Sequence, residues 1–194
     1  PIIKRDSEID GNGPNFWGSV VFDPEERLFK LWCMCHTFKK PENLNHLYFT
    51  SKDGVHWDRP QLGIRGPGNR FSPPGYPGGH AGMWVTVWKD TKETDSQKRF
   101  KGFIQRNPLY SMTSPDGLRW TLQKIAAHYT DDTTTVAFNP QRGEFVKIGR
   151  FCPDGRSLAL RLMMTCVSQT ESADGNSAWH LVMLPDEQDL AADP

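Results

Sequence analysis

Hydrophobic residues occur along the chain in short runs that end at turn-forming residues. Residues 20–22 form one such run, which Asp23 and Pro24 end, and residues 28–33 form the next. Runs of this length, bounded by Pro, Gly, Asp or Asn, are typical of short β-strands. The pattern predicts three groups of strands: near 19–22, 28–37 and 46–50 with a weak fourth after Trp57; near 83–88, 100–105, 109–113 and 120–123; and near 134–138, 145–150, 158–168 and 179–183.

A turn motif, Ser-x-Asp-Gly followed by Trp, occurs three times. It spans residues 51–57 and 114–120, and residues 172–179 with one additional residue before the Trp. Asp accepts hydrogen bonds from the N–H groups that follow it, and Gly supplies a positive φ. The Trp ring can then fold back over the turn. We interpret Asp53, Asp116 and Asp174 as turn-forming residues and not as catalysts.

A second repeated element precedes each of these turns. Residues 20–29 match residues 136–145, and both predict a strand, a Pro-containing turn and a strand. Residues 84–103 repeat the scheme with a longer loop. Each unit therefore predicts four antiparallel strands, which is the blade of a β-propeller. The fold class is all-β: one propeller domain over 1–194, with units at about 12–63, 79–124 and 130–184. Propellers carry 4–8 blades, so about three units predict an incomplete ring. The Gly- and Pro-rich segment 63–79 is interpreted as a surface loop.

Charge and cysteine content exclude some functions. The 23 basic and 23 acidic residues cancel, so the chain lacks the basic surface that nucleic acids require. No apolar run approaches the ~20 residues of a spanning helix, so no membrane partner is expected. The sequence begins at Pro1 and not at Met, so we expect an upstream segment, and the lack of a visible secretory signal says nothing about location. An extracellular or periplasmic location is the expectation. Cys33 and Cys35 share one face of a strand without a second pair, which favours buried thiols over a metal site. No cofactor is predicted.

Several segments resemble a known group of bacterial proteins related to glycoside hydrolase family 32. They are residues 29–32, 47–60, 132–146 and 184–189, and together they extend over nearly the whole chain. The resemblance implies a five-bladed propeller of the kind shared by families 32, 43 and 68, with about two blades outside this chain. The family motifs Asn-Asp-Pro-Asn-Gly, Arg-Asp-Pro and Glu-Cys are absent. The Ser-x-Asp-Gly turn is also similar to the Asp box of sialidases, but it lacks the residue between Asp and Gly.

The resemblance places catalytic acids at the start of the innermost strand of each blade. Glycoside hydrolysis uses two carboxyl groups, one protonated and one ionised. Only the third unit carries carboxylates there, at Asp131 and Asp132. Asp132 is the stronger candidate for a catalytic or sugar-binding acid, and its alternative role is to cap the strand that follows.

Four further residues are candidates for substrate binding. Trp17 and Trp84 open the first strands of two units and could stack on sugar rings, although such rings more often fill the core between blades. His80 follows a glycine pair and is either a ligand contact or an ordinary loop histidine. Arg150 ends a strand and could bind a hydroxyl or form a surface ion pair. The sequence and the resemblance thus predict a carbohydrate-active propeller, a relative of glycoside hydrolases that acts on furanosides or on the glycosidic bonds of a polysaccharide. The alternative is a non-catalytic carbohydrate- or protein-binding propeller.

Overall fold

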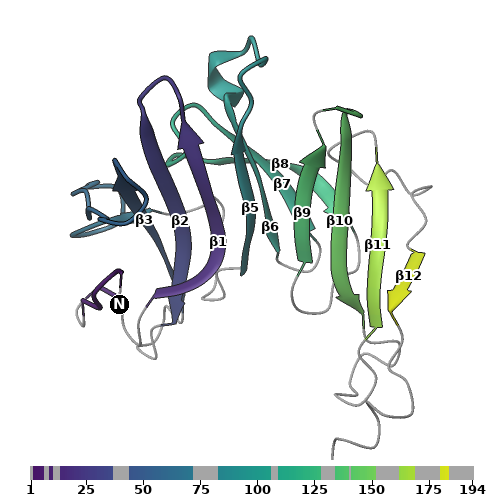
Figure 1. Ribbon diagram of the computed structural model, residues 1–194, viewed down its shortest axis with the longest axis horizontal. Coiled ribbons are helices and arrows are strands. Elements are labelled where there is room, and N and C mark those ends of the chain that lie inside the picture. The colour runs from purple at the N-terminus through teal and green to yellow at the C-terminus, as the bar shows by residue number, and fades with distance from the viewer. Residues whose placement is uncertain are drawn as a thin grey trace, which may run out of the picture.

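The computed structural model describes residues 2–6, 9–10, 14–36, 44–71, 83–105, 109–127, 134–139, 141–151, 162–168 and 180–183. These residues form three four-stranded antiparallel sheets that follow one another along the chain. The sheets stand side by side as an open arc (Figure 1). We call them blades 1, 2 and 3. Within the described ranges, no helix is long and apolar enough to cross a membrane.

Each blade contains its strands in sequence order. Blade 1 consists of β1 (Pro14–Asp23), β2 (Leu28–His36), β3 (Leu44–Ser51) and β4 (Arg70–Phe71). Blade 2 consists of β5 (Met83–Lys89), β6 (Phe100–Gln105), β7 (Leu109–Ser114) and β8 (Thr121–Ala127), with the short 3-10 helix η1 (Ser96–Lys98) between β5 and β6. Blade 3 consists of β9 (Thr134–Asn139), β10 (Glu144–Phe151), β11 (Leu162–Ser168) and β12 (His180–Met183). The predicted all-β repeat of four strands is confirmed.

The fourth strand of blade 1 differs from the prediction. After Trp57 only Asp58 pairs with β3, through two backbone hydrogen bonds with Thr50. The chain then leaves the sheet, and the strand that completes the blade is β4, where Phe71 lies opposite His46. Residues 70–71 therefore belong to the sheet and not to the surface loop expected over 63–79. Phe71 is fully buried, and burial of its ring accounts for the return of the chain to the blade.

The Ser-x-Asp-Gly turns have the predicted geometry in blades 1 and 2. Asp53 Oδ1 accepts hydrogen bonds from the backbone N–H groups of Val55 and His56, at 2.8 and 2.7 Å. Gly54 has φ +77°, and its carbonyl accepts a 3.1 Å hydrogen bond from Trp57 Nε1. The turn at Asp116 repeats each of these contacts. The third copy lies outside the described residues.

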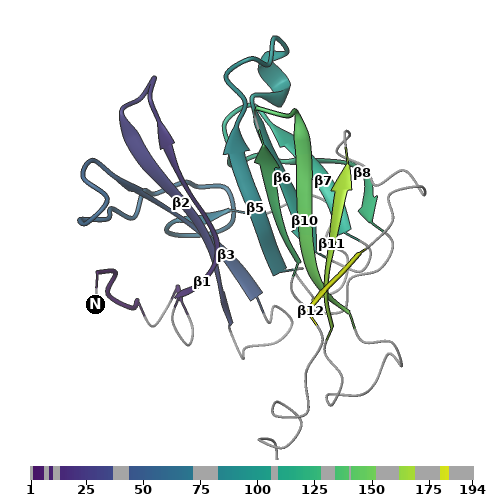
Figure 2. The same cartoon turned by 45° about the vertical axis from the view of Figure 1, so that its right-hand side comes forward.

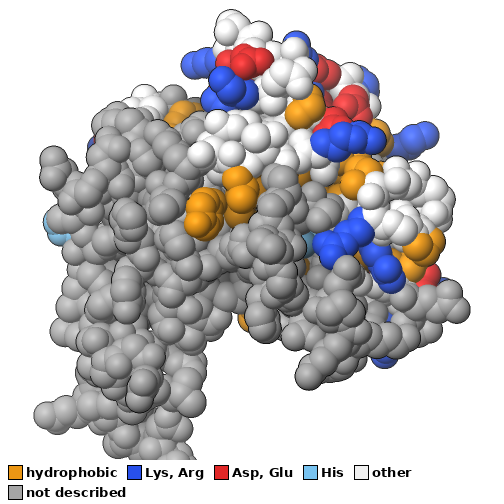
Figure 3. Space-filling model, turned by 180° about the vertical axis from the view of Figure 1, so that it is seen from behind, with side chains coloured by type: hydrophobic (Ala, Val, Ile, Leu, Met, Phe, Trp, Pro, Cys, Tyr) orange, Lys and Arg blue, Asp and Glu red, His pale blue; other side chains and the backbone are white. Residues whose placement is uncertain are grey.

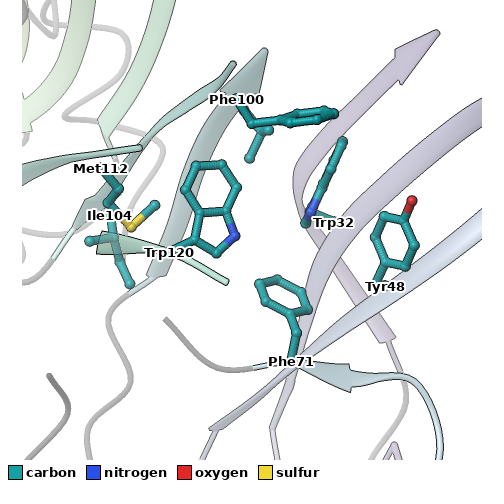
Figure 4. Packing of buried hydrophobic residues seen from close by; sticks show 8 residues of the cluster. Trp32, Tyr48, Phe71, Phe100, Ile104, Met112 and Trp120 are labelled. Carbon is teal, nitrogen blue, oxygen red and sulfur yellow. The ribbon is translucent and has the colours of Figure 1, made fainter. Parts of the chain in front are cut away.

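A cluster of large side chains fills the interface between blades 1 and 2 (Figure 4). Trp32 of β2 lies at its centre and is fully buried. Its ring makes tilted contacts with Tyr48 and Phe100, and its Nε1 donates a 2.6 Å hydrogen bond to the carbonyl of Gly117. The turn of blade 2 is therefore bonded directly to the middle of blade 1.

A smaller aromatic cluster joins blades 2 and 3. Trp88 stacks on Phe103 within its own blade and on Phe138 of β9, with ring centroids 5.7 and 6.1 Å apart. Phe145 of β10 contacts both Trp88 and Phe103. The second interface therefore rests largely on ring packing.

The face of blade 1 that points away from blade 2 is covered by the N-terminal segment. Ile3 and Ile9 pack there against a buried cluster that includes Phe49 and the two thiols. Cys33 and Cys35 are buried and free, as predicted.

Candidate functional site

The first strands of the three blades, β1, β5 and β9, lie next to one another and run in the same direction (Figures 1 and 2). We call them the inner strands. The backbone N–H of Val87 donates to Ser19 Oγ at 2.8 Å, which fixes β5 beside β1. The N–H of Val136 donates to Thr86 Oγ1 at 3.2 Å, which fixes β9 beside β5 in the same way. The starts of the three inner strands therefore lie together on one side of the molecule, which we call the inner-strand end.

A β-bulge lies at the start of β1. Asn15 is opposite Met34 and Ser19 is opposite Trp32, so the residues between Asn15 and Ser19 face Cys33 alone. Gly18 makes this possible, because a Cβ there would lie 1.8 Å from the carbonyl oxygen of Trp32. Bulges redirect side chains and are frequent beside active sites. In this bulge Trp17 keeps 46% of its surface exposed, although it is a large apolar residue.

A second bulge occupies the corresponding place in blade 2. Trp84 is opposite Ile104 and Thr86 is opposite Phe103, so Val85 has no partner of its own in β6. Two of the three inner strands thus begin with an irregularity at the same end. The β-bulges therefore lie at the positions of the two candidate residues Trp17 and Trp84.

The other candidate residues differ in how far the structure describes them. Asp131, Asp132 and His80 lie outside the described residues, as do the segments immediately around them. Trp84 and Arg150 are described through their backbone alone. Thr134 is opposite Gly149, so Arg150 lies at the end of the blade where β9 begins. The positions of Trp17, Trp84 and Arg150 therefore all lie at the inner-strand end.

Asp10, which precedes the first inner strand in the sequence, lies in a different environment. It is fully buried and forms a two-oxygen ion pair with Arg59, at 2.7 and 2.5 Å. Arg59 also donates to the carbonyl of Lys4 and covers the ring of Phe49. Asp10 therefore fastens the N-terminal segment to the outside of blade 1 through a buried ion pair.

The two buried thiols do not offer a metal or nucleophilic site. Burial raises the pKa of Cys33, and it raises the pKa of Cys35 to about 11, with the nearby Asp10 carboxylate adding to the shift. Thiols of this kind stay protonated at neutral pH, whereas metal ligands and nucleophiles are thiolates. Among the described residues, no group of three His, Cys, Asp or Glu side chains is placed to hold a metal ion.

The opposite end of the inner strands carries a network of charges. Asp23 is fully buried where β1 ends, and it pairs with Lys30 at 2.8 Å and with Lys89 of blade 2 at 2.7 Å. Lys89 also pairs with Glu25, which Arg99 approaches at 3.5 Å. Viewed from behind, acidic and basic side chains stand beside one another in the upper part of the molecule (Figure 3). The described residues at this end therefore stabilise the interface between blades 1 and 2, and they present no surface of one charge.

The Asp23 carboxylate makes the interface between blades 1 and 2, which we call the first interface, sensitive to acid. Burial alone would raise its pKa, but the hydrogen bonds from Lys30 and Lys89 outweigh burial and lower the pKa from 3.8 to about 2. A carboxylate with a depressed pKa stabilises the folded state above pH ~4, and this contribution is lost as the pH falls toward 2.

We expect the difference in free energy of unfolding between the protein and Asp23→Asn to shrink by about 2 kcal/mol between pH 5 and pH 2. Urea unfolding at the two pH values measures it. Glu26→Gln is the control, because Glu26 pairs with Lys30 in the same network but is exposed. An unchanged difference for Asp23→Asn would contradict the assignment.

Comparison with known proteins places the fold but not the family. No protein-family model matches the sequence, and no curated protein matches it. Among solved structures, an N-acetylgalactosamine deacetylase from F. plautii in complex with blood group B trisaccharide is 17% identical, with a TM-score of 0.59 over 84% of this chain and 50% of that chain. The β-fructofuranosidase from Schwanniomyces occidentalis complexed with fructosyl-erythritol is 13% identical, with a TM-score of 0.50 over 87% of this chain and 32% of that chain. A variant of that enzyme complexed with fructosylnystose gives 0.51 at 14% identity, over 88% and 33%.

These likenesses show the fold. It is a β-propeller of the kind found in five-bladed glycoside hydrolases such as the fructofuranosidase, and the described residues form three blades of an incomplete propeller. The chain spans half or less of the length of the structures it matches. The predicted fold class and the resemblance to five-bladed propeller proteins are confirmed at the level of structure.

Sequence reasoning missed two features of the inner strands. The bulge in β1 had a signal in Gly18, because a glycine inside a strand pattern often marks a bulge or a close approach of backbones. The hydroxyl contacts also had a signal, because Ser19, Thr86 and Thr135 occupy the same position in the aligned units. The bulges change the backbone at the starts of β1 and β5, and the hydroxyl contacts hold neighbouring inner strands together.

Proposed function

We propose that this protein is a carbohydrate-active propeller related to glycoside hydrolases, which acts on furanosides or on a polysaccharide at the inner-strand end. The observation that carries the proposal is the convergence of the three strand starts, with a half-exposed Trp17 held there by a bulge. An exposed indole face is a suitable platform for the apolar face of a sugar ring. The fold likeness to a fructofuranosidase complexed with fructosyl-erythritol supports the same class of ligand.

The chemistry that we assign to the site uses the residues just before β9. Asp132 acts as one carboxyl group of the pair that glycoside hydrolysis requires, and Asp131 is the second candidate. His80 and Arg150 donate hydrogen bonds to sugar hydroxyls, and Trp17 and Trp84 stack on the rings. Because β9 is bonded to β5 and β5 to β1, Thr134 begins its strand at the same end as Trp17, which supports a role for the residues that precede Thr134 in the sequence.

The test separates turnover from binding. Release of reducing sugar is measured on fructofuranosides, arabinofuranosides and the corresponding polysaccharides, and binding is measured on a glycan array. We expect Asp132→Asn to lower turnover at least about 100-fold with binding retained, since loss of a general acid or base costs 10²–10⁴ in rate. Trp17→Ala should weaken binding.

Matched variants make the outcome decisive. Asp116→Asn removes a carboxylate of the same type from a turn, so it should leave turnover unchanged when assayed below its unfolding temperature. Val20→Ala is the control for Trp17→Ala, because Val20 is exposed on β1 as well. Glycan binding without turnover would establish the non-catalytic alternative, and the absence of both would overturn the proposal.

A further inference from the structure

The N-terminal segment is attached to blade 1 by side chains and not by a β-ladder. We call residues 2–6 and 9–10 the strap. Among the described residues, no strand pairs with the strap. The N–H groups of Asp6 and Asp10 bond within the strap itself, to Asp10 Oδ2 and to the Asp6 carbonyl, both at 2.8 Å. The strap can therefore leave blade 1 while the sheets keep their own hydrogen bonds.

Arg59 holds the strap at two places. Its guanidinium pairs with both carboxylate oxygens of Asp10, at 2.7 and 2.5 Å, and it donates to the carbonyl of Lys4 at 2.7 Å. The Asp10 side chain is fully buried in this pair. Removal of one partner of a buried ion pair leaves the other charge uncompensated, which is strongly destabilising. The closed position of the strap therefore depends on the pair between Asp10 and Arg59.

Two thiols lie beneath the strap. Cys33 and Cys35 are fully buried. Ile3 and Ile9 pack against the cluster that contains them, and Cys35 Sγ donates to the carbonyl of Ile9 at 3.8 Å. Burial is the main cause of the raised pKa of both thiols, and the Asp10 carboxylate adds to it. Departure of the strap removes this carboxylate and part of the burial together, so both thiols gain access to solvent and thiolate character.

We propose that the strap opens as a unit while the three sheets stay folded, and that its opening makes Cys35, and after it Cys33, a site of thiol–disulfide exchange. The thiolate attacks one sulfur of a small disulfide, the protein forms a mixed disulfide, and the other half leaves as a thiolate; the proton of the original thiol passes to solvent. Cys35 reacts first because it contacts the strap directly, and because burial raises the pKa of Cys33 more than that of Cys35.

Modification of Cys35 also has a structural consequence. Its sulfur has no exposed surface and is in contact with the backbone of Ile9, so an added group cannot fit beneath the closed strap. A mixed disulfide therefore holds the strap open until a reductant removes it, and closure restores an inert thiol. The strap and the thiols together form a redox-sensitive device that does not depend on the proposed activity.

Reaction with dithiobis-nitrobenzoate, a small aromatic disulfide, tests the proposal. Cys152→Ser and Cys166→Ser are introduced throughout, so that only Cys33 and Cys35 can react. Release of the nitrothiobenzoate anion gives the rate at neutral pH, and mass spectrometry of peptides identifies the modified residue. The rate is measured in urea below the unfolding transition. Opening of the strap exposes little surface and gives a small slope, whereas reaction through global unfolding gives the full m-value.

We expect Asp10→Asn to raise the rate of modification of Cys35 roughly 100-fold, with the small urea slope retained. Asp23→Asn is the matched control, because it breaks a buried ion pair of the same blade that does not contact the strap. It should lower the free energy of global unfolding but change the rate by less than about twofold. Equal acceleration by the two variants would overturn the proposal, as would a lack of reaction in Asp10→Asn or modification of Cys33 before Cys35.

A second pair of variants tests the strap without a change of charge. Gly68 and Gly66 have φ of +80° and +68°, so an added Cβ is strained at both positions. At Gly68 the Cβ would overlap the side chain of Ile9, whereas at Gly66 nothing lies within 4 Å. We expect Gly68→Ala to raise the rate about 5–10-fold and Gly66→Ala to raise it less than about twofold. Equal rates in these two variants would contradict the closed position of the strap, even if Asp10→Asn fails to fold.

Discussion

Trp32→Ala is expected to lower the free energy of unfolding by about 4 kcal/mol, since truncation of a large buried aromatic residue in a core costs 3–5 kcal/mol. The ring is fully buried between two blades, and it touches Tyr48 on one side and Phe100 on the other. Truncation leaves a cavity that neither sheet can close alone. It also leaves the carbonyl of Gly117 without the Trp32 donor. Chemical denaturation with far-UV circular dichroism measures the loss.

Two variants separate the contributions of Trp32. Trp32→Phe keeps an aromatic ring but removes the hydrogen bond, so it should cost less than Trp32→Ala by about 2 kcal/mol. Trp17→Ala removes the same type of side chain from a half-exposed position and should cost under about 1 kcal/mol. A cost for Trp32→Ala that is no larger than the cost for Trp17→Ala would show that the interface is not packed as described.

Gly117→Ala is expected to cost about 3 kcal/mol, and Gly54→Ala only about 1 kcal/mol, although both glycines have the same place in the same turn. Their φ angles are +76° and +77°, so the strain of an added Cβ in the left-handed region is equal. At Gly54 the nearest atoms belong to Phe29 and are 3.7 Å away. At Gly117 the added Cβ would lie 2.8 Å from Trp32 Cζ2 and 3.3 Å from Phe100. The difference between the two variants therefore measures contact between blades.

A double-mutant cycle checks the cause of that difference. In the Trp32→Ala background the 2.8 Å contact with Trp32 is gone and only the 3.3 Å approach to Phe100 remains, so the cost of Gly117→Ala should fall close to that of Gly54→Ala. Urea unfolding of the four proteins provides the comparison. An unchanged cost of Gly117→Ala in that background would place the effect in the turn itself.

Most of the strand pattern was predictable from the sequence, because each strand ends at a local signal. Asp23 and Asn139 both accept backbone hydrogen bonds just after an inner strand, and the sequence shows these residues in the same place of the repeat. β4 was missed because its signal is not local. Its two residues follow a glycine-rich excursion, and only the pairing with β3 and the burial of Phe71 define them as a strand.

The location of the candidate site was predictable from the sequence, but the contacts of its side chains were not. A four-stranded repeat implies that the inner strands begin together, which the contacts of Val87 and Val136 confirm. The roles of Asp131, Asp132 and His80 remain predictions. The sequence did not show how Trp17 would be held, since the bulge depends on a carbonyl of another strand that approaches Gly18.

The unequal chemistry of the two blade interfaces has a consequence for how the protein comes apart. The first interface combines the Trp32 cluster with the Asp23–Lys89 pair, whereas the described part of the second is held by stacked rings around Trp88. Protonation of Asp23 as the pH falls toward 2 acts directly on the first interface. Acidification toward pH 2 should therefore loosen blade 1 before the ring contacts between blades 2 and 3, and a partly unfolded form should accumulate with those contacts intact.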